Sequence, residues 1–481
     1  MVSRRAHISR PGFVAAVCAF AVLATLAVTA LAAGPTVTKK APGKSPLFGI
    51  EDDRIVGGAD PVARVRLLVE AGASVVRIPL RWDLVAASKP AAPANPADPA
   101  YDWSRYDAMV AAANANHAAV LFTVYGTPAW ARDPAVPADP HWPAFSARPF
   151  DPTDFGRFGE VAARRYAPRG VHRWEAWNEP NISLFLRPQY GRSGGKWVPT
   201  SPATYSAMLT SFSTRVKAAD PTAVVAGAVT APAGDRCPDC PLDRPPTRVT
   251  PGDFIAALGT PGLRPPMDVV SHHPYPLRKP TDSTPAGRTY VDVYNLSVLT
   301  RAIDATYLRG KKLWLTEFGF ATRPVPEYPI AFSRAQQAAY IVDAYRRMKA
   351  NPRVTLAVYY FLQDHAGWAS GILEQSGAKK PGAQALALPF AAAVPGPAKR
   401  GSSVALVGQV RASAGAATVL VQRKASAKWV TLKTLRTAGD GSFKVALRPT
   451  AKMLLRAKWS GRTRIGTPAT MISPPVTITV R

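Results

Sequence analysis

The sequence is poor in cysteine and in acidic residues, and each shortage excludes a class of protein. Only 3 of its 481 residues are cysteine, which is too few for a scaffold built on disulfides. Charged residues make up only 19% of the chain and hydrophobic residues 47%, so the chain is too apolar to be disordered. At about 150 residues per domain, this length predicts roughly three domains, or one large domain with an appendage.

The shortage of acids is greatest at the C-terminal end. There are 31 Asp and Glu residues against 60 Lys and Arg in the whole chain, and residues 399–481 contain 16 Lys and Arg but a single acid, Asp440. This tail favours an anionic partner. Because it lacks the clustered aromatic residues on which bases stack, we expect no nucleic acid partner, and nucleic-acid binding by the tail stays a third hypothesis.

A long apolar run occurs only once, near the N-terminus. Residues 13–33 follow the tandem Arg4-Arg5 and end in Ala30-Leu31-Ala32, a small-residue pattern that signal peptidases cut. We therefore predict a signal peptide at 1–33, a linker at 34–45 and a secreted mature protein. The alternative is an uncleaved membrane anchor, because the run is long enough to span a bilayer.

Two cysteines remain once Cys18 is assigned to the leader. Cys237 and Cys240 could form a redox motif, half of a metal site or a small disulfide loop. The absence of a second pair and an oxidising compartment favour the disulfide.

Short segments rich in Val, Ile, Leu and aromatic residues recur every thirty to fifty residues from Leu47 onward. The predicted strands are 47–51, 75–82, 119–126, 173–178, 223–229, 268–275, 312–318 and 356–363. Amphipathic stretches between them predict helices, among them 63–71, 106–116, 154–166, 202–219 and 334–349. This alternation is typical of parallel sheets with crossover helices.

Eight such units predict a (β/α)8 TIM barrel over residues 46–392, with its active site at the C-terminal ends of the strands. The alternative is an open doubly wound sheet, which requires a Gly-rich phosphate-binding turn after the first strand. Gly57-Gly58 lacks that spacing, and this disfavours the open sheet.

The helical period disappears after Pro395-Gly396-Pro397. Short strands are predicted at 404–410, 417–422, 429–435, 443–447, 453–459 and 476–480. This spacing predicts a small all-β, immunoglobulin-like sandwich over 401–481, joined to the barrel by a linker at 393–400.

Two glutamates occur at the ends of predicted barrel strands. Glu179 follows the fourth strand, and Glu317 lies at the end of the seventh. These strands are three apart in an eight-stranded ring, so the two side chains can face each other across its mouth. A carboxylate beside aromatic residues is costly to desolvate, and two opposed carboxylates are what glycoside hydrolysis requires.

The segments Asn178-Glu179-Pro180 and Thr316-Glu317-Phe318-Gly319 resemble the signature motifs of the clan A (clan GH-A) glycoside hydrolases. Within that clan the chain is similar to families 5 and 39. Supporting segments are found at 75–79, 101–107, 126–130 and 273–275.

The resemblance implies a retaining double displacement. It assigns Glu179 as the acid/base and Glu317 as the nucleophile. Asn178 would hydrogen-bond the 2-hydroxyl of the sugar, Arg77 would keep the nucleophile anionic, and Tyr275 would donate a hydrogen bond to the same carboxylate.

The resemblance also points to residues that shape the sugar subsite. His273 would line it; the adjacent His272 faces the opposite side of the strand, so one of the two belongs to the core. Trp368 is the candidate for the aromatic floor, and Trp82 and Trp130 are candidates to stack further sugars. Each of these tryptophans can equally be explained by core packing.

A third glutamate, Glu175, precedes the motif on the same strand. Strand alternation puts it on the same side as Glu179 but deeper in the barrel. There it is expected to form an ion pair with Arg77 rather than to act in catalysis.

One position departs from family 5, whose cellulases tend to carry a histidine at the end of the third strand. This sequence has Val124-Tyr125-Gly126 there, which shifts the resemblance toward family 39 and its xylosidases and exopolysaccharide-cutting enzymes.

The sequence thus predicts a secreted O-glycosyl hydrolase that acts on a poly- or oligosaccharide. The alternative is a catalytically silent glycan-binding or wall-associated protein on the same scaffold. No metal-ligand spacing is visible, so neither a metal nor a cofactor is expected. The expected partners are the carbohydrate substrate and, through the basic tail, an anionic cell-wall polymer.

Overall fold

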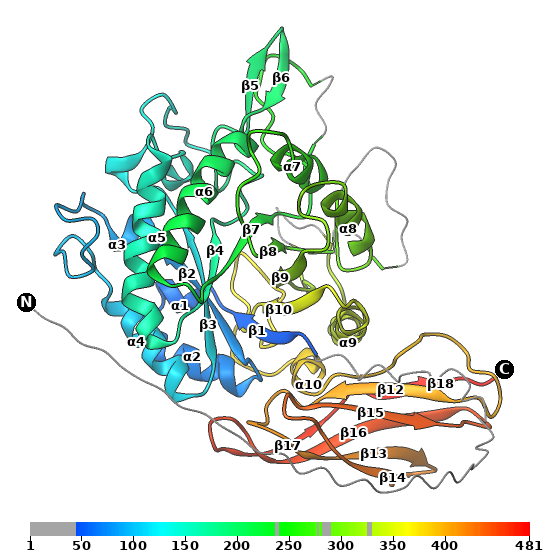
Figure 1. Cartoon of the computed structure of the whole chain (residues 1–481). Helices are drawn as coiled ribbons and strands as arrows, with labels where there is room; N and C mark the ends of the chain where they lie inside the picture. The colour runs from blue at the N-terminus through cyan, green and yellow to red at the C-terminus, as the bar shows by residue number, and fades with distance from the viewer. Residues whose placement is uncertain (1–44, 236–239, 277–278, 281–289, 325–329) are drawn as a thin grey trace, which may run out of the picture. The chain divides into compact units, whose positions relative to one another are not determined.

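The computed structural model describes residues 45–235, 240–276, 279–280, 290–324 and 330–481 (Figure 1). The predicted signal peptide, all but the last residue of the linker that follows it, and Cys237 lie outside the described residues. Cys240 is disulfide-bonded. Every helix among the described residues is too short or too polar to traverse a bilayer.

The predicted barrel strands close into a parallel barrel in the order β1-β10-β9-β8-β7-β4-β3-β2 (Figure 1). Its strands are β1 Leu47–Glu51, β2 Val75–Arg81, β3 Ala119–Tyr125, β4 Arg173–Ala176, β7 Val224–Thr230, β8 Val269–His272, β9 Lys312–Phe318 and β10 Val354–Tyr360. The predicted TIM-type barrel is therefore confirmed, and it is the fold that the resemblance to clan A glycoside hydrolases implies.

Helices and short turns of helix follow the strands. The α-helices are α1 Arg54–Gly57, α2 Pro61–Glu70, α3 Trp82–Val85, α4 Ser104–Ala115, α5 Pro152–Tyr166, α6 Ser201–Ala219, α7 Pro251–Leu258, α8 Leu296–Asp304, α9 Arg334–Ala350 and α10 Pro381–Ala387. The 3-10 helices are η1 Ala129–Ala131, η2 Ala144–Ser146 and η3 Ala167–Arg169. An antiparallel hairpin of β5 Tyr190–Ser193 and β6 Lys196–Pro199, which the sequence pattern did not predict, lies between β4 and α6 in the chain.

Helices begin at capping residues that can be recognised in the sequence. The Asp151 carboxylate accepts a hydrogen bond from the backbone N–H of Thr153 at 2.8 Å, and Pro152 occupies the first helical position of α5. Ser333 and Gln336 form a reciprocal capping box at the start of α9. These contacts satisfy backbone donors that have no partner within the helix.

The barrel interior changes from apolar to polar along the strands. Its apolar part is a cluster of Val75, Leu121, Ala226, Val269, Trp314, Leu356 and Val358. Two residues further along the same inward-facing rows, Arg77 follows Val75 and Thr123 follows Leu121. Side chains that alternate with these face the helices and join the main core. The polar end of the interior is the C-terminal end of the strands.

The C-terminal region forms two antiparallel sheets, as a β-sandwich requires. One has the order β11-β12-β15, and the other has the order β14-β13-β16-β17 with β18 paired to β16. The strands are β11 Phe390–Ala392, β12 Val404–Gln409, β13 Thr418–Ala425, β14 Lys428–Arg436, β15 Ser442–Leu447, β16 Met453–Arg462, β17 Pro468–Ile472 and β18 Val476–Ile478. Apolar residues of both sheets share one core cluster, so the prediction of a sandwich is confirmed.

Two strands of the sandwich were not predicted. β17 mixes proline, threonine and exposed residues, and β11 precedes the predicted linker and pairs with β12. Neither is long or apolar enough to stand out by its own pattern. The proposed domain limits themselves stay predictions.

Candidate active site

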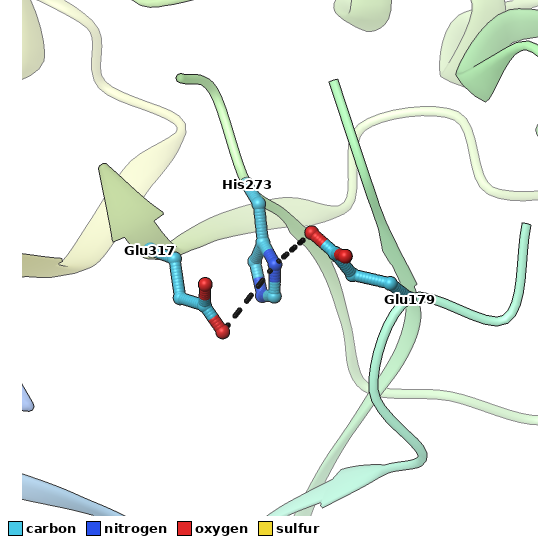
Figure 2. A group of neighbouring side chains, drawn as sticks. All are labelled: Glu179, His273 and Glu317. Carbon is cyan, nitrogen blue, oxygen red and sulfur yellow. Dashed lines mark hydrogen bonds and ion pairs between the residues drawn. The ribbon is translucent and has the colours of Figure 1, made fainter. Parts of the chain in front are cut away.

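Glu179 and Glu317 meet at the C-terminal end of the barrel (Figure 2). One carboxylate oxygen of each residue and a ring nitrogen of His273 all lie within 4.8 Å of one another. His273 Nδ1 is 2.8 Å from Glu179 Oε1 and 3.5 Å from Glu317 Oε1. Each of the three residues is less than 10% exposed, so the two carboxyl groups face each other in a largely desolvated space.

The backbone at Glu179 is in an unusual conformation. Its φ angle is +40°, in the left-handed region that L-residues rarely adopt. It directly follows Asn178 and is the third residue after the end of β4. Such conformations concentrate at functional sites, because the surrounding structure must hold them in place.

Glu317 turns inward because β9 contains an irregularity. Leu315 pairs with Ala357, but Phe318 pairs with Tyr359, so β9 has one residue more than β10 between these pairs. The bulge breaks the strict alternation of the strand. Thr316 and Glu317 thus both contact residues of the barrel interior, Thr316 through Ser271 Oγ at 2.6 Å.

Arg77 holds the nucleophile candidate in place. Its Nη1 donates to Glu317 Oε1 at 2.6 Å and also contacts the carboxylate of Glu51, while its Nε donates to Glu175 Oε2 at 2.7 Å. The predicted ion pair between Arg77 and Glu175 is therefore confirmed. One buried guanidinium thus forms ion pairs with three buried carboxyl groups.

Glu175 is the most heavily hydrogen-bonded of the three. Thr123 Oγ1 and Ser271 Oγ each donate to it at 2.6 Å. Burial alone would raise the pKa of Glu175, but the charge of Arg77 and these hydrogen bonds outweigh burial and hold the pKa below its ordinary value. Glu175 is therefore the ionised partner of Arg77.

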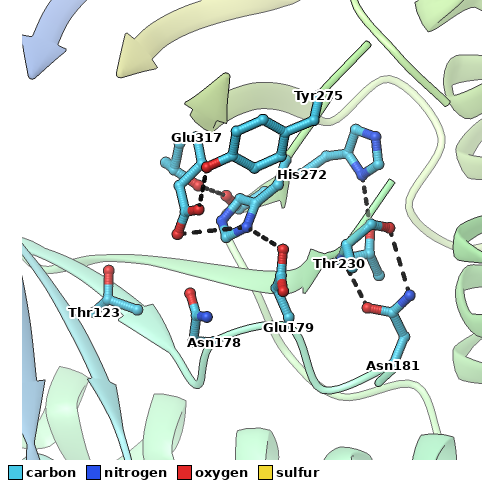
Figure 3. A network of polar contacts seen from close by, with 12 residues as sticks. Thr123, Asn178, Glu179, Asn181, Thr230, His272, Tyr275 and Glu317 are labelled. Carbon is cyan, nitrogen blue, oxygen red and sulfur yellow. Dashed lines mark hydrogen bonds and ion pairs between the residues drawn. The ribbon is translucent and has the colours of Figure 1, made fainter. Parts of the chain in front are cut away.

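Tyr275 and Asn178 complete the surroundings of Arg77 and Glu317. Tyr275 Oη donates to Glu317 Oε2 at 2.7 Å (Figure 3). Arg77 Nη2 donates to Asn178 Oδ1 at 2.9 Å. Because a guanidinium can only donate, this contact fixes the amide oxygen toward Arg77 and leaves the Asn178 amide N–H groups for the cavity.

The environment of Glu179 differs from that of Glu317. Burial raises the pKa of Glu179 above its ordinary value, and the contact with His273 offsets only part of that effect. Glu317 instead accepts hydrogen bonds from a guanidinium and from a tyrosine hydroxyl. The two carboxyl groups thus lie in different environments, as the different roles of paired catalytic carboxyls require.

These groups line a cavity of about 110 Å³. The lining consists of Glu51, Asp53, Arg77, Pro79, Thr123, Tyr125, Asn178, Glu179, Phe185, Glu317 and Tyr360. Of the residues predicted for the site, Arg77, Asn178, Glu179 and Glu317 line this cavity, and His273 and Tyr275 bond directly to its two carboxylates. Larger hollows exist elsewhere on the surface, but they lack this convergence of buried carboxyl groups.

The three tryptophans predicted for substrate binding do not belong to that lining. Trp82 is 1% exposed and packs against Trp130 and against phenylalanines of α5. The Trp130 indole N–H donates to the carbonyl of Ala86 at 2.8 Å. Trp368 packs edge to face on Tyr275 and Tyr360, with centroids 5.7 and 5.9 Å away. Trp368 therefore packs against Tyr275, which bonds to Glu317, and against Tyr360, which lines the cavity.

The two adjacent histidines point in opposite directions. His272 contacts Thr230 Oγ1 at 2.9 Å and the carbonyl of Val291 at 3.0 Å (Figure 3). Burial lowers the pKa of His272 to about 3, so it is neutral and belongs to the core. His273, on the other face of the strand, is the histidine that reaches the two glutamates.

Several lining residues were missed by sequence reasoning. Glu51 is the last residue of β1, and Asp53 lies two residues after it. Tyr125 is the last residue of β3, and Tyr360 is the last residue of β10. Their position at strand ends is a signal that could have identified them, because the same argument selected Glu179 and Glu317. Phe185 lies in the loop between β4 and β5 and carries no comparable signal.

The trio of Glu179, His273 and Glu317 also has the spacing of a cation site. However, Glu317 Oε1, which would be a ligand, already accepts a hydrogen bond from Arg77 Nη1 at 2.6 Å. A guanidinium at that distance repels a second cation in a buried site. The donor set therefore fits a neutral ligand such as a sugar better than a metal ion.

Comparisons with known proteins find only distant similarities. No family profile and no curated protein sequence matches the chain. Among solved structures, it is similar to an exo-β-1,4-mannosidase from Opitutaceae bacterium strain TAV5, with 15% identity and a TM-score of 0.45; the alignment covers 72% of this chain but only 59% of the mannosidase. The catalytic domain of the GH30 xylanase C from Talaromyces cellulolyticus is 12% identical over 90% of this chain and 98% of its own, with a TM-score of 0.47. A xyloglucanase of glycoside hydrolase family 44 from Paenibacillus polymyxa is 14% identical over 72% of this chain and 82% of its own, with a TM-score of 0.36. Similarities this distant assign neither a family nor a substrate.

Proposed function

We propose that this protein is a retaining glycoside hydrolase that cleaves O-glycosidic bonds of a poly- or oligosaccharide. The observation that carries the proposal is that one carboxylate oxygen of Glu179 and one of Glu317 lie within 4.8 Å of each other. Retaining enzymes hold their carboxyl groups about 5–5.5 Å apart, whereas inverting enzymes need about 6.5–9.5 Å to admit a water molecule. The spacing therefore supports a double displacement.

In the first step, Glu179 protonates the glycosidic oxygen while Glu317 attacks the anomeric carbon. The bond between that carbon and the leaving oxygen breaks, the leaving group departs as an alcohol, and a glycosyl ester forms on Glu317. Because its pKa is raised, Glu179 can hold the proton that this step consumes.

In the second step, Glu179 is ionised and takes a proton from water. The resulting nucleophile attacks the anomeric carbon from the opposite face to Glu317, and the ester bond breaks. Glu317 leaves as a carboxylate, which Arg77 and Tyr275 stabilise through their hydrogen bonds. The product keeps the anomeric configuration of the substrate.

The proposal is tested by kinetics on a panel of aryl β-glycosides and glycans. We expect Glu317→Gln to lower kcat by about 10⁴-fold or more, because it removes the nucleophile. Glu179→Gln should lower kcat by about 10²–10⁴-fold on substrates with poor leaving groups. The matched control is Glu70→Gln, at the C-terminal end of α2, because Glu70 is a carboxylate outside the cavity lining.

Two further readouts separate the roles of the glutamates. The first sugar product, observed by NMR before it mutarotates, should have the anomeric configuration of the substrate. Azide should restore turnover of Glu179→Gly on an activated aryl glycoside and give a β-glycosyl azide, whereas Glu317→Gly should give the α-azide. Unchanged hydrolysis in Glu317→Gln would refute the proposal, and saturable glycan binding without turnover would favour the silent glycan-binding alternative.

We further propose that the sandwich binds an anionic cell-wall polymer. The residues that alternate with its core along β13 and β16 face away from that core and include Lys424, Arg456 and Lys458. The Trp429 ring lies beneath the Arg456 guanidinium at 4.2 Å and near the Lys424 ammonium at 5.6 Å. We call Lys424, Trp429, Arg456 and Lys458 the basic face. Lys424 is exposed, and Arg456 and Lys458 are half-buried. Cations grouped near an aromatic ring suit a chain of negatively charged sugars or phosphates.

We also propose that the protein is secreted after removal of residues 1–33. The proposal rests on the N-terminal sequence. Expression with the native leader in a bacterial host should release a protein whose mass corresponds to a chain that begins near residue 34. A membrane-bound product of full mass would support the uncleaved anchor instead.

A further inference from the structure

Glu51 is a buried carboxyl group that the double displacement does not use. It ends β1, is 2% exposed and lines the cavity with Glu179 and Glu317. Its side chain contacts Arg77 Nη1, the same nitrogen that donates to Glu317. Whether Glu51 is ionised or protonated in this position therefore has to be explained.

The charges around Arg77 do not balance if every carboxyl group is ionised. Glu51, Glu175 and Glu317 all bond to this one guanidinium. Three anions and one cation would leave two uncompensated negative charges in a buried space, which is strongly unfavourable. A proton on one of the three carboxyl groups would halve this excess of negative charge.

The hydrogen bonds identify which carboxyl group that is. Glu175 accepts from Arg77 and from two hydroxyl groups, and Glu317 accepts from Arg77 and from Tyr275. Within the described part of the chain, the side chain of Glu51 accepts from Arg77 alone. Because each donor stabilises the ionised form, Glu51 is the group whose ionisation is least supported.

The wider surroundings of Glu51 act in the same direction. The charged and titratable side chains that face it or share its guanidinium are Asp53 after β1, Arg77 on β2, Tyr125 on β3, Glu175 on β4, His273 after β8, Glu317 on β9 and Tyr360 on β10. Among these, Arg77 is the cation that forms an ion pair with Glu51. Burial raises the pKa of Glu51 well above its ordinary value, and Arg77 only partly offsets this.

We propose that Glu51 is a specificity-determining residue, a protonated carboxylic acid that lines the cavity and donates a hydrogen bond to an oxygen of the bound sugar. A carboxylate here could only accept hydrogen bonds, whereas the neutral acid presents an O–H group. The ligand atom is a hydroxyl or ring oxygen of the sugar that reacts with Glu317. The identity of this ligand rests on the proposed function, but the protonation state of Glu51 does not.

The protonation state can be measured without turnover. In a Glu179→Gln background, which removes the other cavity carboxyl of raised pKa, we expect the infrared carbonyl band of a protonated carboxylic acid at pH 7. Adding Glu51→Gln should remove intensity from that band. If the difference spectrum shows no loss of a protonated carboxyl group, Glu51 is ionised and the proposal is overturned, whether or not the protein proves to be a glycosidase.

The hydrogen bond to the sugar is tested by a pair of variants of similar size. Glu51→Met has no donor and should raise KM by about tenfold, with a smaller effect on kcat, because one hydrogen bond is lost. Glu51→Gln keeps a donor at the same length and should recover most of that loss. Equal KM values for the two variants would overturn the donor role. Thermal melts of both proteins identify a variant that has failed to fold, and the infrared measurement then decides.

Discussion

The residue that organises the site is Arg77. It bonds to the nucleophile candidate Glu317, to the ionised Glu175 and to Glu51, and it orients the amide of Asn178. Its own position follows from β2, where it is the inward residue that succeeds Val75. A single cation thus sets the charge of one wall of the cavity. Glu179, on the opposite wall, has no direct bond to Arg77 in the described contacts and relies on burial and His273.

The raised pKa of Glu179 predicts the alkaline side of the activity profile. Glu179 must be protonated to act as an acid, so kcat/KM for substrates with poor leaving groups should fall as pH rises through its pKa in the folded protein. Because burial raises this pKa, the fall should occur above about pH 4.3, the ordinary value for glutamate. The pH dependence of kcat/KM measures it.

The leaving group provides the control. A dinitrophenyl glycoside needs no proton to depart, so its profile should show a much weaker alkaline fall. Glu179→Gln should show none on either substrate. An unchanged alkaline fall in that variant would mean that another group titrates there.

At the scale of elements, the end of β9 decides where Glu317 points. The bulge between Leu315 and Phe318 turns Glu317 toward Arg77. Gly319 follows immediately, and a Cβ atom there would lie 2.1 Å from the carbonyl oxygen of Tyr360 and within 3 Å of the Ser370 side chain. The end of β9 therefore approaches β10 more closely than any side chain would allow.

Gly319→Ala is expected to separate catalysis from folding. The added methyl group must push β9 away from β10, and this displaces Glu317. A displacement of about 1 Å costs about 10²-fold in rate, so we expect kcat to fall by about 10–100-fold while the barrel persists by circular dichroism.

Gly57→Ala is the matched control, because a Cβ atom at Gly57 meets nothing within 4 Å. It should leave kcat within about twofold of the native protein. A Gly319→Ala protein of native kcat would show that β9 tolerates the methyl group without moving Glu317.

At the scale of the whole chain, the two proposed functions belong to parts that differ in charge. The cavity is lined by four carboxyl groups and one guanidinium, whereas residues 399–481 contain 16 basic residues and one acid. A cavity of that composition suits a neutral sugar, and the tail suits a polyanion. We therefore expect polymer binding and hydrolysis to respond independently to mutation.

The triple variant Lys424→Glu, Arg456→Glu and Lys458→Glu tests the basic face. It should weaken binding of the full-length protein to a poly(glycerol phosphate) chain by at least about tenfold, and binding of the native protein should weaken as salt rises, because the attraction is electrostatic. Hydrolysis of a small aryl glycoside should be unaffected, because none of these residues lines the cavity. Binding is measured by co-sedimentation or calorimetry.

A variant with the same change in net charge provides the comparison. Arg66→Glu, Lys196→Glu and Arg309→Glu alter exposed positions of the barrel region. This protein should retain most of its affinity. Equal losses in the two triple variants would show that binding follows net charge and not the basic face.

Much of the fold was predictable from local pattern. β1 and β9 have the predicted limits, and the other barrel strands differ by one to three residues at either end. Apolar periodicity and capping residues act within a few residues of the chain, so they can be read without the structure. β17 of the sandwich was missed because it is short, begins with proline and has no fully buried residue.

Site residues that belong to a recognisable sequence motif could be predicted. Residues that reach the site only because the fold brings them close could not. Arg77, Glu175, Glu179 and Glu317 were all expected near one another, and the structure brings them together. Glu51 was not, although it also ends a strand, because nothing in its own neighbours distinguishes it from a surface carboxylate. Trp82 shows the converse, since its residue type suggested a sugar platform and its burial places it in the core.

The amino-acid order by itself determined the alternation of strands and helices, the two glutamates at strand ends and the basic tail, because each depends on residues close in the chain. Closure of the barrel decided the rest. It placed three carboxyl groups on one guanidinium, turned Glu317 inward through an irregular pairing with β10, and packed Trp368 against Tyr275 and Tyr360. These outcomes depend on the register between strands that are distant in sequence, and no local pattern encodes that register.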